Sequence, residues 1–176
     1  QKTYDLDNEM DEDYTELQTF FARKELKLIK KRLRRGQERT AAEGGYLASA
    51  PFGYEKTRAG RLPTLRVNEE EARFVRAAFD RCAAGESCTA IACFLNACGA
   101  QPRRSAAFTR GSVLALLRNP VYTGAIVWNR RRYRRANGGG RGCSKTENPR
   151  PLWLTADGCH EALVPPELFH RVQEQL

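Results

Sequence analysis

Acidic residues are missing from the middle of this sequence: residues 87–146 contain no Asp or Glu. The same stretch carries eleven Lys and Arg, nine of them between Arg103 and Arg135. A basic surface without balancing acids repels itself and lowers stability, so a polyanionic partner is its usual reason. The formal net charge of +9 favours the same kind of partner. Nucleic acid is the leading candidate.

Other absences exclude further classes of protein. No apolar run approaches the roughly 20 residues that cross a bilayer, so we expect no membrane partner. The two His and five Ser lack a general base or partner at recognisable spacing, and there is no phosphate-binding loop and no paired-carboxylate motif. We therefore predict no catalytic residues in this chain.

The cysteines are not spaced as the ligands of a metal site are, and the sequence gives no sign that they form disulfides. Four of the six Cys fall within helix-like patterns, and none forms a C-x2-C pair. No signal-peptide pattern occurs. We interpret the Cys as buried free thiols in a reducing cytoplasm, and we predict neither a metal nor a cofactor in this chain.

The N-terminal part is divided by charge. Residues 1–22 hold seven acids and one Lys, whereas residues 23–39 hold nine basic residues and two acids. This polarity suits a helix dipole, and few helix breakers interrupt the segment, so we predict one long helix from Asp11 to Arg39 that ends near Gly36 or slightly later. Its apolar stripe predicts contact with another subunit or domain; a surface helix of the same domain is the alternative. The stripe consists of Ala22, Leu26, Ile29 and Leu33.

Turn and capping signals divide the rest of the chain. Gly44-Gly45 marks a linker, residues 52–57 and 62–67 predict a hairpin, and three further helices are expected after the caps Asn68, Ser87 and Thr109. The later elements are a strand at 122–128 leading into 130–135, a mobile loop at 138–150, a returning strand at 159–164 and a last helix from Pro166. The expected fold class is α+β and mainly helical. It has a long N-terminal helix, then a compact helical domain with a helix-turn-helix-like pair and a small antiparallel sheet.

Two of the predicted helices, 88–98 and 109–118, have the outline of a helix-turn-helix with a longer connection than the tight motif. Arg at the N-terminal end of the second helix can donate two hydrogen bonds to guanine, and short hydroxyls reach base edges or phosphate. A plain helical hairpin with a solvated basic face is the alternative, but such faces usually mix both signs of charge. The DNA contacts expected here are Arg103, Arg104, Ser105, Thr109, Arg110, Ser112 and Arg118.

Two further basic clusters extend the expected interface. Residues 130–135 suit a strand that tracks phosphates or an arm in a groove, with a charged loop flank as the alternative. The end of the long helix suits a passage over the DNA backbone, and the narrow glycine segment after it fits the minor groove. The contacts expected from these clusters are Arg130, Arg132, Arg134, Lys30, Lys31, Arg34, Arg35, Arg39, Gly44, Gly45 and Tyr46.

The motifs together resemble a known family, the large serine recombinases. Residues 22–36 are similar to the end of the long helix that leaves the catalytic domain of that family. Gly45-Tyr46 followed by Pro51-Phe52-Gly53-Tyr54 is similar to its linker and Pro-Tyr-Gly-Tyr element, with Phe52 as a departure. The most specific motif is Leu117-Arg118-Asn119-Pro120-Val121-Tyr122-Thr123-Gly124, which residues 160–164 and 167–169 continue. The resemblance covers nearly the whole chain.

The resemblance implies part of a site-specific DNA recombinase from a phage or mobile element. Residues 1–40 would be the end of the catalytic domain with its long helix, 41–52 a linker, and 53–176 the recombinase DNA-binding domain. In that family the serine nucleophile, which forms a 5′-phosphoserine intermediate, lies in an upstream resolvase-like domain, and a zinc ribbon lies downstream. We therefore expect this chain to be a fragment that is inactive alone. Zinc would belong to the domain after residue 176.

The partners and location follow from the same resemblance. They are double-stranded DNA at an attachment half-site and further copies of the protein, as a dimer and as a synaptic tetramer. The expected location is the cytoplasm of a bacterium.

Other classes stay open on the residues alone. A transcriptional regulator would bind DNA and use the long helix only to dimerise. An RNA-binding protein is also compatible, because basic loops suit an A-form backbone. The aromatic residues fall mostly in predicted cores, which disfavours single-strand binding. A protein-interaction module built on the long helix would leave the basic stretch without a purpose.

Overall fold

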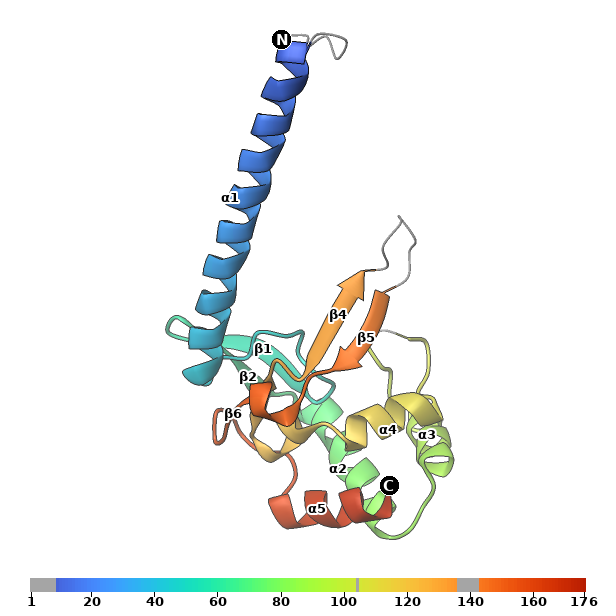
Figure 1. The fold of residues 1–176 in the computed structure, drawn as a ribbon. Coiled ribbons are helices and arrows are strands. Elements are labelled where there is room, and N and C mark those ends of the chain that lie inside the picture. The colour runs from blue at the N-terminus through green and yellow to red at the C-terminus, as the bar shows by residue number, and fades with distance from the viewer. Residues whose placement is uncertain (1–8, 104, 136–142) are drawn as a thin grey trace. The chain divides into compact units, whose positions relative to one another are not determined.

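The structure is a computed structural model that describes residues 9–103, 105–135 and 143–176. The chain divides into two compact units, residues 1–39 and 40–176. Helices dominate, and the strands form small antiparallel sheets (Figure 1). The predicted fold class, α+β and mainly helical, is confirmed.

The first unit is formed by the helix α1, Glu9–Ala42, whose last residues belong to the second unit. The helix continues through Gly36 and ends three residues after the predicted Arg39. One exposed Gly costs a helix only about 1 kcal/mol relative to Ala, which does not end a helix of this length. The end comes at Gly44, which adopts a φ of +82° while its N–H donates to the Ala41 carbonyl at 3.1 Å. Such a left-handed glycine is a usual way to cap a helix C-terminus.

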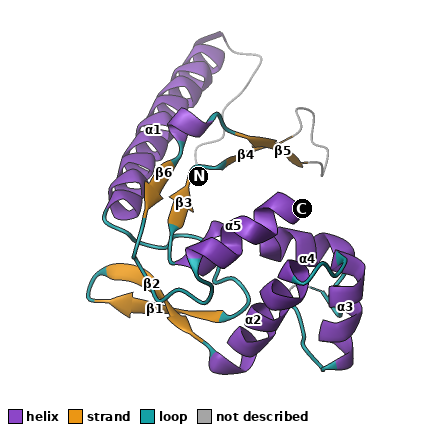
Figure 2. Cartoon of the chain, turned by 90° about the horizontal axis from the view of Figure 1, so that it is seen from below, coloured by secondary structure: helices purple, strands orange, loops and turns teal. Residues whose placement is uncertain are grey.

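Helices α2, α3 and α4 of the second unit begin just after the predicted caps. Asn68, Ser87 and Thr109 each accept a hydrogen bond from the backbone N–H three residues later. Helices α3 and α4 lie side by side next to α2 (Figure 2). The bounds are α2 Glu69–Ala83, α3 Cys88–Ala97, α4 Arg110–Leu117 and α5 Pro166–Gln175.

Within the part of the chain that the structure describes, the strands form three antiparallel pairs. The predicted hairpin is present as β1 (Tyr54–Ala59) and β2 (Leu62–Val67), with Gly60 at a φ of +62° in its two-residue turn. Strand β3 (Ile126–Trp128) pairs with β6 (Leu154–Ala156), and β4 (Arg131–Arg135) pairs with β5 (Cys143–Glu147).

Three predicted elements between residues 122 and 164 were wrong in part. The strand expected from Tyr122 begins only at Ile126, because Asn119-Pro120 starts a 3-10 helix, η1 (Pro120–Thr123), which Gly124 ends. Residues 159–164 form no strand. The Cys159 N–H donates instead to the Gly124 carbonyl, and the N–H groups of Leu163 and Val164 both donate to the Tyr122 carbonyl. Two donors on one carbonyl do not form the ladder of hydrogen bonds that pairs two strands.

The loop expected at 138–150 also contains regular structure. Its residues 143–147 belong to β5, and Arg150 opens the 3-10 helix η2 (Arg150–Leu152). The earlier part of the predicted loop, through residue 142, lies outside the described residues.

The core of the second unit joins the hairpin, α2 and η1. Tyr54, Phe79 and Tyr122 are almost fully buried, with ring centroids 6.0 Å apart for Tyr54–Tyr122 and 5.8 Å for Phe79–Tyr122. The hydroxyls of Tyr54 and Tyr122 donate to the carbonyls of Glu161 and Phe52. These hydrogen bonds tie residues that are distant in the sequence to one centre.

The five cysteines whose side chains are described are free thiols. The prediction that they are buried holds for Cys82 but is wrong for Cys93 on α3 and for Cys98 just after it, which are both exposed. Apolar residues repeat on more sides of α3 than the helix buries, which explains the error.

Among the described residues, no helix is both long enough and apolar enough to cross a membrane.

Candidate nucleic-acid interface

The arginines of the acid-free stretch fall into two groups. Within the described residues, Arg103 pairs with Glu71 and Arg130 pairs with Glu147, each at 2.9 Å. By contrast, Arg110, Arg118, Arg131 and Arg132 are exposed and form no ion pair in the described part of the chain. The second group is therefore available to an anionic partner.

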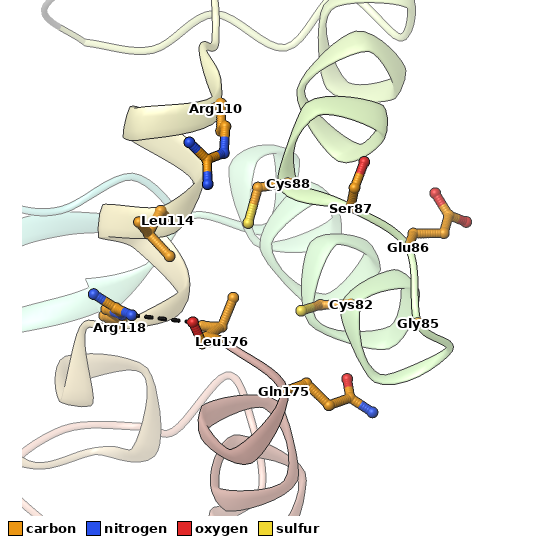
Figure 3. Close-up of a pocket in the computed structure, with 10 residues that line it drawn as sticks. All are labelled: Cys82, Gly85, Glu86, Ser87, Cys88, Arg110, Leu114, Arg118, Gln175 and Leu176. Atoms are coloured by element: carbon orange, nitrogen blue, oxygen red, sulfur yellow. Dashed lines mark hydrogen bonds between the residues drawn. The ribbon is translucent and has the colours of Figure 1, made fainter.

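Helix α4 carries two of these arginines at its ends. Arg110 is its first residue, and Arg118 follows its last, about 12 Å further along at 1.5 Å per residue. Together with Leu114 and the α2–α3 turn they line a pocket of about 610 Å³ (Figure 3). Arg118 also donates from Nη2 to the Leu176 carbonyl at 3.3 Å.

Two hydroxyls expected to contact DNA also build the start of α4. The Thr109 hydroxyl accepts from the Ser112 N–H at 3.3 Å, while the Ser112 hydroxyl accepts from the Thr109 N–H at 2.8 Å. This reciprocal capping box satisfies N–H groups that a helix start leaves unpaired. Ser105 likewise donates to the Ala107 carbonyl at 3.1 Å. All three hydroxyls thus have partners inside the chain, and Thr109 and Ser112 fix the position of Arg110.

Arg103 is a predicted site residue that bonds to two other segments of the chain. Its Nη2 donates to the Tyr54 carbonyl at 2.6 Å and to the Glu71 carboxylate at 2.9 Å. The same Glu71 oxygen accepts from the Gly53 N–H at 2.8 Å. Arg103 therefore ties the connection before α4 to the hairpin and to α2. Its neighbour Arg104 lies outside the described residues.

Asn96 is a positioning residue that the sequence analysis missed. Its side chain donates to the Phe108 carbonyl at 2.9 Å and accepts from the Phe108 N–H at 2.8 Å. Phe108 is buried, with its ring 5.2 Å from that of Phe52. Asn96 thereby holds α3 against Phe108, the residue that precedes the N-cap of α4. A polar amide near the end of an otherwise apolar helix was the available signal.

The second basic cluster forms a strand rather than a loop flank. Arg131 and Arg132 are exposed on β4, and Arg130 precedes the strand. The backbone of Arg134 is placed in β4, but its side chain lies outside the described residues. The sequence analysis missed Arg150 and Trp153, which lie beside this strand pair; the Arg130 guanidinium is 5.3 Å from the Trp153 ring.

The glycine segment after α1 makes close contacts within the second unit. A Cβ on Gly44 would lie 2.8 Å from the sulfur of Cys159, and one on Gly45 would lie 2.8 Å from the Thr40 carbonyl oxygen. The N–H of Tyr46 donates to the Pro63 carbonyl at 2.7 Å, and burial raises the pKa of the Tyr46 hydroxyl. Internal packing alone thus requires small residues at both glycines.

The third basic cluster lies on α1. Lys30, Lys31 and Arg35 are exposed and form no ion pair with any described residue, whereas Arg34 pairs with Glu38 at 2.9 Å. Arg39 is in the last turn of the helix.

His160 has a structural role in the second unit. His160 is half-buried, its Nε2 lies 2.7 Å from the Val121 carbonyl, and burial lowers its pKa. Its Nδ1 is the one buried side-chain polar atom without a partner in the described part of the chain. Among the described residues no group of three His, Cys, Asp or Glu side chains is placed to hold a metal ion.

Comparison with known families identifies the chain. The sequence profile of the family described as Recombinase matches residues 69–176. The chain belongs to the Recombinase family. The large serine recombinase that the sequence motifs suggested is thereby confirmed as the family of this chain.

Solved structures show where the Recombinase fold recurs. One is a crystal structure of an LSR–DNA complex, with 24% sequence identity, a TM-score of 0.55, and coverage of 82% of this chain and 37% of that chain. Another comes from work on the sequence requirements of the Listeria innocua prophage attP site, with the same identity and TM-score, and coverage of 82% and 50%. This Recombinase chain thus spans half or less of the length of these structures, and the likeness shows a shared fold. No curated protein matched the chain.

Proposed function

We propose that residues 53–176 bind double-stranded DNA in a sequence-specific manner at a recombination attachment half-site. The observation that carries the proposal is α4. It presents Arg110 and Arg118, exposed and free of ion pairs with described residues, on a helix held by α3 in a helix-turn-helix-like pair. Membership of the Recombinase family and the fold shared with an LSR–DNA complex support it.

In this proposal Arg110 reads bases. It lies at the N-terminal end of α4, from which an extended guanidinium can donate two hydrogen bonds to a guanine edge in the major groove. Arg118, Arg131 and Arg132 contact phosphates, which adds affinity without sequence preference. The basic residues of α1 cross the backbone, and residues 44–46 follow the minor groove.

The proposed role in the parent protein follows from the family. Residues 1–40 lead from a catalytic domain whose serine cleaves DNA through a 5′-phosphoserine link, and residues 41–52 connect them to the DNA-binding part. Zinc belongs to a separate zinc-ribbon domain of the parent. The protein acts on DNA in the bacterial cytoplasm.

Self-association through α1 completes the proposal. Eight large apolar side chains of this helix are exposed by 43–61%. At about 100° per residue, Tyr14, Leu17, Phe21 and Leu28 share one face, while Leu26, Ile29 and Leu33 share another. Two apolar faces suit contacts with two neighbouring helices, as a dimer within a synaptic tetramer requires.

The test is a selection of bound sequences from random DNA duplexes at about 0.15 M salt. Enrichment of one asymmetric half-site supports the proposal, whereas retention without any motif contradicts the sequence-specific part. If six basic residues meet phosphate, the logarithm of affinity should fall with the logarithm of salt concentration at a slope of roughly −5. Preference for RNA over duplex DNA in a competition would contradict the choice of nucleic acid.

A further inference from the structure

A basic groove lies next to the C-terminal end of α4 and encloses about 760 Å³. Three arginines, one tryptophan, one histidine and one glutamate give the groove its chemical character. They are Arg118, Arg130, Arg150, Trp153, His170 and Glu147. Of these, only Arg118 and Arg130 belonged to the interface predicted from the sequence.

A network of asparagines holds the aromatic side of the groove in place. The Trp153 Nε1–H donates to the Asn148 carbonyl at 2.7 Å, and the Asn148 side chain donates to the Asn129 carbonyl at the same distance. Asn129 in turn donates to the Leu152 carbonyl at 2.8 Å. Asn129 has a φ of +61°, which only Asn, Asp and Gly adopt readily. The groove wall is thus fixed by hydrogen bonds and does not depend on a partner.

The charges of the groove are unbalanced. The guanidinium groups of Arg130 and Arg150 lie 5.3 Å and 5.6 Å from the centre of the Trp153 ring. Glu147 accepts a hydrogen bond from Arg130, which lowers the pKa of its carboxyl, and the fields of Arg131 and Arg150 act in the same direction. One carboxylate therefore faces several guanidinium groups, and the groove keeps a net positive charge.

We propose that this groove binds the sugar–phosphate backbone of the same DNA duplex that α4 reads. The inference rests on the proposed function and adds Arg150 and Trp153 to its contacts. Arg118 supports the assignment because it lines both this groove and the pocket beside α4, so a strand that leaves α4 passes directly to the groove. Guanidinium groups bind phosphate oxygens, and the fixed indole face packs against deoxyribose.

The test compares three variants of the whole chain by equilibrium binding to duplex DNA over a range of salt concentrations. Arg150→Ala removes one phosphate contact and should reduce the magnitude of the salt slope by about 0.9, equal to roughly an 8-fold loss of affinity at 0.1 M salt. Glu147→Gln keeps the acceptor for Arg130 but removes the opposing charge. Affinity should therefore rise for all duplexes alike, a gain that misfolding cannot produce.

Arg171→Ala is the matched control, because Arg171 is an exposed arginine of α5 that lies outside the groove. Its slope should equal that of the unmodified protein. The groove assignment is overturned if Arg150→Ala leaves the salt slope unchanged and Glu147→Gln leaves the affinity unchanged. If the unmodified protein still selects a half-site in that case, the proposed function stands. Such a groove would suit an acidic peptide instead. If the unmodified protein retains no duplex, the proposed function fails together with the inference.

Discussion

The connection before α4 and the exposed side of α4 carry arginines from the same acid-free stretch, yet these arginines have different surroundings. Arg103 donates to Tyr54 and Glu71 and holds the connection to the rest of the domain. Arg110, seven positions later, forms no ion pair with any described residue. Two arginines of equal charge therefore have different roles: Arg103 is structural, whereas Arg110 points its charge outward. Arg103 differs because a carbonyl and a carboxylate from distant segments contact it.

The largest expected effect concerns the structural side of this comparison. Asn96→Ala removes both hydrogen bonds to Phe108 and leaves the backbone groups of a buried residue without partners. We expect a loss of about 2–3 kcal/mol in the free energy of unfolding, measured by urea denaturation. Thr89→Ala, at an exposed position of the same helix, is the control and should change stability by less than about 0.5 kcal/mol. Equal stability of the two variants would contradict the role given to Asn96.

The next effect concerns the outward side. Arg110→Ala should reduce the discrimination between cognate and random duplexes by about 1–3 kcal/mol, because one two-bond contact to a base is lost. Folding stability should stay nearly unchanged. Arg34→Ala, on α1, should instead weaken binding to all duplexes alike. Binding titrations with both classes of DNA distinguish the two, and equal losses on both for Arg110→Ala would show that this arginine reads no base.

Arg103→Ala should give the opposite result to Arg110→Ala. The loss of the Glu71 pair and of the hydrogen bond to Tyr54 should lower the free energy of unfolding by about 1–2 kcal/mol, a value reduced by the partial exposure of the pair. Sequence preference should persist in the folded fraction. Arg58→Ala on the hairpin, an arginine without an ion pair among the described residues, provides the stability control. If Arg103→Ala instead relaxed the sequence preference and left the stability unchanged, Arg103 would have the same role as Arg110.

The smallest effect is a pH dependence of the structural side. Burial lowers the pKa of His160, so below about pH 6.5 the unfolded chain binds more protons at this residue than the folded protein. The contribution to stability is complete above that pH and is lost as the pH falls through the lowered pKa. Urea denaturation at pH 7.5 and 5.5 should show a smaller decrease for His160→Gln than for the unmodified protein. His170→Gln, at an exposed position, should show the full decrease.

Local patterns predicted the helices well. Asn68, Ser87 and Thr109 cap three helices as expected, because capping depends on residues within one turn of each other. The hairpin was also predictable, since Gly60 lies in a two-residue turn between its strands.

The sheet partners and the roles of single side chains were harder to predict. The partner of β3 is Leu154–Ala156 rather than 159–164, because η1 replaces the first half of the expected strand. Arg150 and Trp153 were not predicted as site residues. A loop was predicted over 138–150, and it gave no reason to expect a hydrogen-bonded turn beside a strand. Gly44 and Gly45 were assigned to DNA, but their close contacts with Cys159 and Thr40 already account for glycine.

The sequence by itself determined where three helices of the second unit begin, the fold class, the family and the basic character of the acid-free stretch. These properties depend on residues close together in the chain or on composition alone. The tertiary structure decided which basic residues face outward, because Glu71, Tyr54 and Glu147 approach their arginines only after the chain folds. An arginine surrounded by such partners satisfies its hydrogen bonds internally, while one without them presents its charge to solvent.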